Sequence, residues 1–213
     1  MEDLILTGYE FLTVMLPALL LAGMFYLSKK KLHPKAAIWH SLFLLVFAYY
    51  LYGVFHFTGT GTIFHVKQYG IALSTASINL IPFSSEAIDL TGYGLNVVLF
   101  MPLGFFLPFL WEKYDRLPRA CVFGFLLSLL VEISQLLNIR ATDVDDLILN
   151  TLGTVLGFVL FRLYVRLIKR TARAFEDDTA SHRPEAFFFV ALLFLCRFFT
   201  YYEFGMAKML YHF

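Results

Sequence analysis

Apolar stretches of about twenty residues recur along this chain, and each is long enough for a helix to cross the hydrocarbon core of a bilayer. Only 15% of the residues are charged and 59% are hydrophobic, which excludes a soluble domain of this length. The sequence therefore predicts an all-α polytopic membrane protein, a helical bundle of about six transmembrane helices. Five spans are expected at 8–27, 36–58, 93–111, 118–138 and 147–168, and a sixth, interrupted by Arg197, at 186–202.

Basic residues concentrate in alternate connections between the spans. Segments 28–35, 112–119 and 162–185 hold most of the 17 Lys and Arg residues. The positive-inside rule places these segments in the cytoplasm, so that both termini and segments 59–92 and 139–146 are expected outside. A charge inside a span needs a partner or a route to the membrane surface, and for Arg197 a possible partner is Glu10 in the first span.

The segment 59–92 is unlike an ordinary loop, because it contains an apolar patch around 78–83 that is too short to cross a bilayer. Pro82 disfavours helical backbone at Ile81. Two interpretations remain open: a re-entrant loop packed over a cavity, or a plain loop at the membrane interface.

A glutamate, Glu132, lies within the fourth span. A carboxylate in a membrane span costs about 2.5–3.5 kcal/mol on insertion scales, and is therefore a functional hypothesis by default. Ser128, Glu132 and Gln135 lie on one helical face because they are four and three residues apart. Glu132, about 9 Å below the outer end of the span, could act as a general acid or base. It could equally be the buried structural partner of Arg140.

Three aspartates, Asp143, Asp145 and Asp146, stand at the start of the fifth span. Carboxylates at a helix N-terminus cap free N–H groups and complement the helix dipole. The same three carboxylates, near Glu132 and Asn150, could hold a divalent cation through oxygen ligands. Their spacing matches no established metal-binding loop, so they remain a weak metal candidate and no metal is assigned.

The fifth span then carries Asp146, Asn150, Gly153 and Gly157 on one face. The glycines allow close helix contact, while the polar pair opens toward the outside, at the same depth as Asn96 in the third span. We expect an outward-facing polar cavity among the third, fourth and fifth spans; a polar network that only joins helices is the alternative. The ligand-binding candidates are Asn79, Asn96, Glu132, Gln135, Arg140, Asp143, Asp146 and Asn150, and the catalytic candidates are Glu132 and Asp146.

Four motifs carry a family resemblance: NLIPF at 79–83, Asn96 with FMPLGFFLP at 100–108, SLLVEISQ at 128–135 and RATDVDDLILNTLGTVLG at 140–157. Over about 36–168 the chain resembles the VanZ-like family, which is named for a protein that accompanies glycopeptide resistance clusters and is associated with teicoplanin resistance. The resemblance implies a multi-pass protein of the bacterial cytoplasmic membrane that influences susceptibility to glycopeptide or lipoglycopeptide antibiotics. The motif residues carried over are Asn79, Pro82, Phe83, Asn96, Pro102, Gly104, Glu132, Gln135, Arg140, Asp143, Asp146, Asn150, Gly153 and Gly157.

Two functional hypotheses of different classes follow. In the first, the cavity binds a lipid-linked cell-wall precursor or the acyl tail of a lipoglycopeptide. In the second, an intramembrane enzyme acts on a lipid-linked envelope substrate, with Glu132 as acid or base, Arg140 contacting a phosphate and the aspartates positioning a metal. Membrane lipids are expected partners; no cofactor and no nucleic acid are expected.

We divide the sequence into a first helix with its basic loop (1–35), a VanZ-like core of four transmembrane helices (36–168), and a charged linker with a C-terminal helix (169–213).

Overall fold

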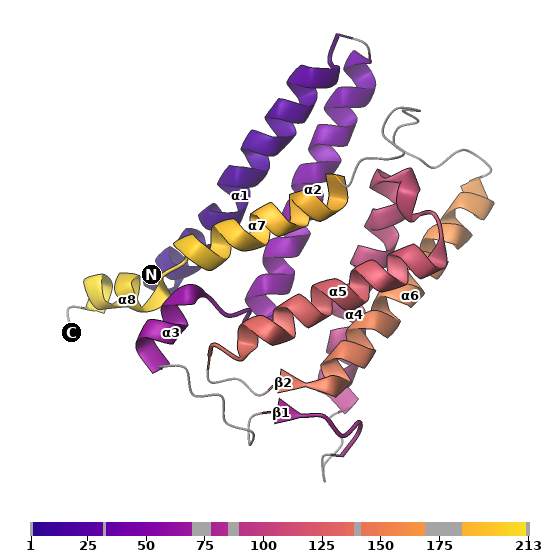
Figure 1. Cartoon of the computed structure of the whole chain (residues 1–213). Helices are drawn as coiled ribbons and strands as arrows, with labels where there is room; N and C mark the ends of the chain where they lie inside the picture. The colour runs from indigo at the N-terminus through magenta and orange to yellow at the C-terminus, as the bar shows by residue number, and fades with distance from the viewer. Residues whose placement is uncertain are drawn as a thin grey trace. The chain divides into compact units, whose positions relative to one another are not determined.

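The chain forms two compact units, each built around its own helices. The computed structural model describes residues 2–31, 33–69, 78–84, 90–138, 142–168 and 185–211. Unit 1 combines Met1–Ala72 with Pro184–Phe213, and unit 2 is Leu73–Arg183. The two units are described separately below (Figure 1).

Unit 1 is built on a hairpin of two long helices, α1 (Glu2–Lys29) and α2 (Pro34–Thr58). It also contains α3 (Ile63–Tyr69), α7 (Glu185–Thr200) and α8 (Glu203–Tyr211). Aromatic side chains fill the contact between α2 and α7: Phe47 stacks on Phe189 at 6.1 Å between ring centroids, and Phe55 meets Phe194 edge-on at 5.9 Å. The helix α2 ends at Gly59, whose left-handed φ of 63° a residue without a Cβ adopts readily.

A buried ion pair joins three helices of unit 1. Arg197 of α7 donates to Glu10 Oε1 of α1 from Nε (2.9 Å) and Nη2 (2.6 Å). The other carboxylate oxygen, Oε2, lies 2.6 Å from His56 Nδ1 of α2, and Arg197 Nη1 donates to the Thr60 carbonyl at 2.8 Å. The partner proposed for Arg197 from the sequence is therefore confirmed, while His56 and Thr60 were not foreseen.

Unit 2 contains three long helices, α4 (Leu90–Leu110), α5 (Leu117–Gln135) and α6 (Val144–Ile168). A single 3₁₀ turn, η2 (Glu112–Tyr114), connects α4 to α5. Two very short strands, β1 (Ile78–Asn79) and β2 (Thr142–Asp143), lie next to each other at the end of the unit where α6 begins (Figure 1).

Glycines allow the backbones of α4 and α6 to touch. A Cβ atom added at Gly153 would overlap the carbonyl oxygen of Val97, and one added at Gly157 would overlap that of Met101. From the opposite side, a Cβ at Gly104 would overlap the Thr154 carbonyl. Small residues at an interface let transmembrane helices approach closely, which is the role expected of Gly153 and Gly157 from their spacing.

The observed helices confirm the predicted fold class. Among the described residues, five helical segments are long and apolar enough to cross a membrane, and a sixth is possible if α7 and α8, bent by 41°, form one span. The protein is thus an all-α, multi-pass membrane protein. The short strands were not expected, and the side of the membrane on which each terminus lies remains a prediction, as does the division of the sequence at residues 35 and 168.

Candidate functional site

The predicted site residues that the structure describes lie at one end of unit 2, where α4 and α6 begin and α5 ends. The segment before α4 and the segment before α6 are held together there by a parallel pairing of β1 with β2, with Ile78 opposite Thr142 and Asn79 opposite Asp143. This pairing brings the NLIPF motif against the aspartate-rich turn, although 64 residues separate Asn79 from Asp143.

The three aspartates have three different tasks. Asp143 caps α6, since its Oδ1 accepts from the Asp145 backbone N–H at 2.9 Å, and its Oδ2 accepts from Asn79 Nδ2 at 3.2 Å. Asp145 holds the other chain segments: Oδ1 accepts from the Phe83 N–H at 2.8 Å and Oδ2 from the Tyr93 hydroxyl at 2.6 Å. Asp146 Oδ1 accepts from Asn96 Nδ2.

These separate tasks bear on the metal hypothesis for the aspartates. Protein N–H and O–H groups already occupy the carboxylate oxygens of Asp143 and Asp145. Within the part of the chain that the structure describes, no group of three His, Cys, Asp or Glu side chains is placed to hold a metal ion. The geometry thus gives the weak metal candidate no support, and the aspartates act as hydrogen-bond acceptors that organise the site.

Glu132 is almost completely buried, with 4% of its surface exposed. Its Oε2 accepts from the Asp143 backbone N–H at 3.2 Å, so it ties the end of α5 to β2. One turn earlier on α5, the Ser128 hydroxyl accepts from Asn150 Nδ2 of α6 at 2.9 Å. This face of α5, predicted from the residue spacing, therefore faces α6.

Asn150 is among the most buried polar residues of the cluster, with only 2% of its surface exposed. Its Oδ1 has no hydrogen-bond partner among the described residues. Leaving a buried acceptor unpaired costs about 1–3 kcal/mol, so this position offers a favourable contact to a water molecule or to a donor group of a ligand.

The loop after β1 presents apolar side chains next to this polar cluster. Asn79 Oδ1 shapes the loop by accepting from the Ile81 N–H at 3.2 Å. Leu80 and Ile81 are 73% and 69% exposed, respectively. Phe83 adopts a left-handed backbone, with φ of 52°, and packs edge-on against Tyr93 at 5.8 Å between ring centroids. A non-glycine residue in this conformation is uncommon and is often found at functional sites.

The structure brings together most of the residues predicted to bind a ligand. Asn79, Asn96, Glu132, Asp143, Asp146 and Asn150 take part in the hydrogen bonds above, and Gln135 is buried at the end of α5. Arg140 lies outside the described residues, so its pairing with Glu132 stays a prediction. The same holds for a re-entrant path of segment 59–92, of which only 59–69, 78–84 and 90–92 are described.

Sequence reasoning did not foresee Tyr93, nor the acceptor role of Asp145 toward the loop. A signal for Tyr93 existed, because it lies three residues before Asn96 and hence on the same face of α4. The buried position of Asp145 has no comparable local signal, since any of three neighbouring aspartates could have faced inward.

Replacing Asp145 by asparagine is expected to release the loop 78–84. The amide oxygen can still accept from the Phe83 N–H, but the amide nitrogen can only donate to the Tyr93 hydroxyl, so the Tyr93 bond must reverse and neither bond has the charge of the carboxylate. Hydrogen bonds to charged groups contribute about 1.5–3 kcal/mol, and amide exchange at Phe83 should accelerate about tenfold or more. Hydrogen–deuterium exchange measures this. Tyr93→Phe is the matched control, since it removes only the hydroxyl; equal exchange at Phe83 in Asp145→Asn and the wild type would contradict the assignment.

Comparison with known proteins agrees with the motifs gathered at this site. The model of the VanZ/LLP1 family matches residues 41–167, which include α4, α5, both strands and all of α6 except its last residue. The chain is also 39% identical over 93 residues to the Protein VanZ of Enterococcus faecium. This alignment covers 41% of this chain and 53% of that protein. The chain thus spans about half the length of this curated relative. No solved structure gives a significant match. The family model covers more than half of the chain, and the protein therefore belongs to the VanZ/LLP1 family.

Proposed function

We propose that this protein lies in the bacterial cytoplasmic membrane and reduces susceptibility to glycopeptide or lipoglycopeptide antibiotics such as teicoplanin. In this proposal the polar cluster of unit 2 faces outward and binds a lipid-linked envelope molecule or the acyl tail of the drug. The observation that carries the proposal is the convergence of the family motifs: residues of the NLIPF loop, α4, α5 and the start of α6 share one hydrogen-bonded cluster.

The chemistry of the cluster suits an amphiphilic ligand. Carboxylate and amide oxygens accept hydrogen bonds from sugar hydroxyl or amine groups, and the unpaired Oδ1 of Asn150 adds a buried acceptor. The exposed Leu80 and Ile81 side chains stand beside these acceptors and can contact an alkyl chain. A lipid-linked precursor and a lipoglycopeptide both combine a polar headgroup with such a chain.

The hydrogen bonds favour a binding role over the enzyme alternative. Among the described contacts, the Ser128 hydroxyl is engaged by Asn150, and Glu132 accepts from a backbone N–H. Nucleophilic catalysis needs a base within hydrogen-bond reach of its nucleophile, whereas both of these contacts hold elements of the fold together. A site that binds a ligand, and so changes how much of its target the drug reaches, needs no pair of nucleophile and base.

The variants Glu132→Gln and Asp146→Asn are expected to lose the protection. Each substitution keeps the size of the side chain but exchanges a carboxyl group for an amide in a buried hydrogen bond, and the predicted loss of affinity is roughly tenfold. The measurement is the minimal inhibitory concentration of teicoplanin in a susceptible host, compared with an empty vector and with the wild-type protein. Glu112→Gln is the matched control. Glu112 is exposed and lies in η2, before α5 begins, at the end of unit 2 opposite the polar cluster.

Immunoblots of membrane fractions must show equal amounts of each variant, so that misfolding is not mistaken for loss of function. Full protection by both variants at normal membrane levels would refute the site, and no difference between wild type and vector would refute the antibiotic role.

Incubation of purified protein with labelled lipid-linked precursors, followed by mass spectrometry, separates binder from enzyme: saturable binding of unchanged lipid supports the proposal, and a new product overturns it in favour of catalysis.

A further inference from the structure

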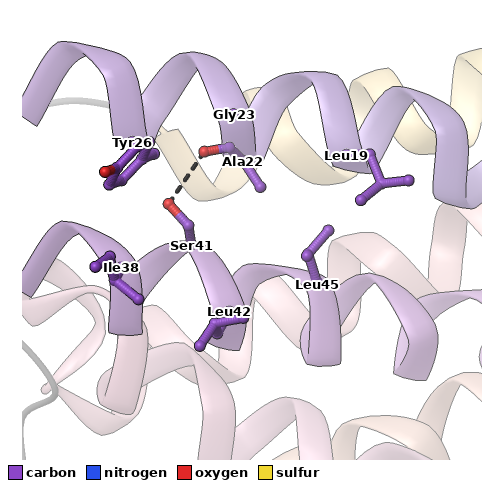
Figure 2. A pocket seen from close by; sticks show the side chains of 8 residues that line it. All are labelled: Leu19, Ala22, Gly23, Tyr26, Ile38, Ser41, Leu42 and Leu45. Atoms are coloured by element: carbon purple, nitrogen blue, oxygen red, sulfur yellow. Dashed lines mark hydrogen bonds between the residues drawn. The ribbon is translucent and has the colours of Figure 1, made fainter. Parts of the chain in front are cut away.

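A second ligand site is suggested by a groove between α1 and α2 in unit 1 (Figure 2). Its volume is about 320 Å³. The α1 wall is a single helical face of four residues spaced at i, i+3, i+4 and i+7, namely Leu19, Ala22, Gly23 and Tyr26. At Gly23 an added Cβ would meet no atom within 4 Å, so the missing side chain contributes directly to the hollow.

The α2 wall repeats the same spacing with Ile38, Ser41, Leu42 and Leu45. The polar group in this wall is already satisfied, because the Ser41 hydroxyl donates to the Ala22 carbonyl at 3.0 Å (Figure 2). The groove thus presents aliphatic and aromatic surface on two helices that are long and apolar enough to cross a membrane. An alkyl chain matches this lining, and a polar ligand does not.

A basic hairpin lies at one end of the groove. The turn between α1 and α2 and its flanks carry four lysines, at 29, 30, 31 and 35. Lys30 Nζ lies 5.8 Å from the centre of the Tyr26 ring, which lines the groove, and the two residues are about one helical turn, or about 6 Å, apart along α1. Clusters of four or more basic residues next to a membrane helix attract anionic lipid headgroups.

We propose that this hairpin binds one anionic phospholipid, with an acyl chain in the groove between α1 and α2 and the phosphate among the lysines. Charge complementarity selects the headgroup, and the apolar lining accepts the chain. From Leu19 to Tyr26 the groove follows α1 for about 10 Å, which matches part of an acyl chain running inward from the membrane surface. This site shares no residue with the polar cluster of unit 2, so either proposal can fail without the other.

The two tryptophans of the chain permit a direct test. Trp39 is 57% exposed and adjacent in sequence to Ile38 of the groove, whereas Trp111 belongs to unit 2. In a Trp111→Phe background, Trp39 fluorescence is measured in vesicles that contain phosphatidylglycerol or phosphatidylcholine with brominated acyl chains. We expect brominated phosphatidylglycerol to quench Trp39 fluorescence with an affinity about fivefold higher than that of brominated phosphatidylcholine. The reason is that each lysine near a membrane surface adds a favourable contact with anionic lipid. Equal quenching by the two lipids would overturn the proposal.

Variants then assign the two parts of the site. Gly23→Leu fills the groove and should abolish the preference for phosphatidylglycerol, while Gly8→Leu is the matched control, because a Cβ at Gly8 of the same helix also meets no atom within 4 Å. The double variant Lys30→Gln with Lys31→Gln should lower the ratio of the affinities for phosphatidylglycerol and phosphatidylcholine toward one. Native mass spectrometry of the chain with both tryptophans intact counts retained phosphatidylglycerol independently of fluorescence. A preference unchanged by Gly23→Leu would refute the groove as the acyl-chain site.

Discussion

Replacing Gly157 by alanine is expected to lower the free energy of unfolding of unit 2 by about 3 kcal/mol. The new methyl group would overlap the backbone carbonyl of Met101, and a backbone atom cannot turn aside as the end of a side chain can. The axes of α4 and α6 would have to separate, which also loosens the contacts at Gly153 and Gly104. Unfolding by a denaturing detergent in mixed micelles, followed by the fluorescence of Trp111 in a Trp39→Phe background, measures the change.

Gly94→Ala is the matched control for this experiment. Gly94 also lies in a helix of unit 2, but a Cβ there meets no atom within 4 Å. Alanine is favoured over glycine inside a helix by about 1 kcal/mol, so Gly94→Ala should leave stability unchanged or raise it slightly. Equal destabilisation by the two variants would mean that loss of the glycine itself, and not the close approach of α4 and α6, is responsible.

The helices could be predicted from the sequence because hydrophobic length is a local property. The second span, for example, was expected at 36–58 and is observed as Pro34–Thr58. A close helix contact at the fifth span was also predicted, because Gly153 and Gly157 are spaced four residues apart on one face, but the sequence did not identify α4 as the neighbour. Both inferences need only the residues of a single helix and the physics of a bilayer.

The internal contacts of the site were harder to predict because they join distant segments. Strands of two residues, such as β1 and β2, contain too few positions for a hydrophobic period to be recognised. Without their pairing, nothing in the sequence places Phe83 beside Asp145. Which of several neighbouring carboxylates caps α6 also depends on the exact path of the turn, and that path is set by Glu132 and Asn79 from other elements.

The pairing of Arg197 with Glu10 was partly predictable, because a charge inside a span needs a partner and the sequence offers few candidates. The positions of His56 and Thr60 could not be inferred in the same way. Both lie near the end of α2, where a polar residue is equally compatible with the membrane interface, so their types alone do not indicate a buried contact.

Replacing Arg197 by methionine is expected to lower the free energy of unfolding of unit 1 by about 3–5 kcal/mol, because it leaves the buried Glu10 carboxylate without its cation. Both side chains are almost fully buried, at 4% and 3% exposed, and the pair joins α7 to α1. Trp39 fluorescence during detergent-induced unfolding reports on this unit. Arg162→Met is the control, and its effect is followed through Trp111 fluorescence because Arg162 lies in unit 2. Arg162 also pairs with a carboxylate, that of Asp115 at 2.9 Å, but its side chain is 52% exposed, and exposed pairs contribute about 1 kcal/mol or less.

A second substitution distinguishes an unpaired charge from a loss of packing. If the cost of Arg197→Met arises from the isolated carboxylate, the double variant Arg197→Met with Glu10→Leu should recover much of the lost stability, because hydrophobic residues of similar size often replace a buried ion pair at little cost. If the cost arises from lost contacts of the guanidinium with the Tyr201 ring, 5.0 Å away, and with the Thr60 carbonyl, Glu10→Leu should destabilise further. Recovery in the double variant, together with a small effect of Arg162→Met, would show that the isolated Glu10 carboxylate, and not lost packing of Arg197, accounts for the cost of Arg197→Met.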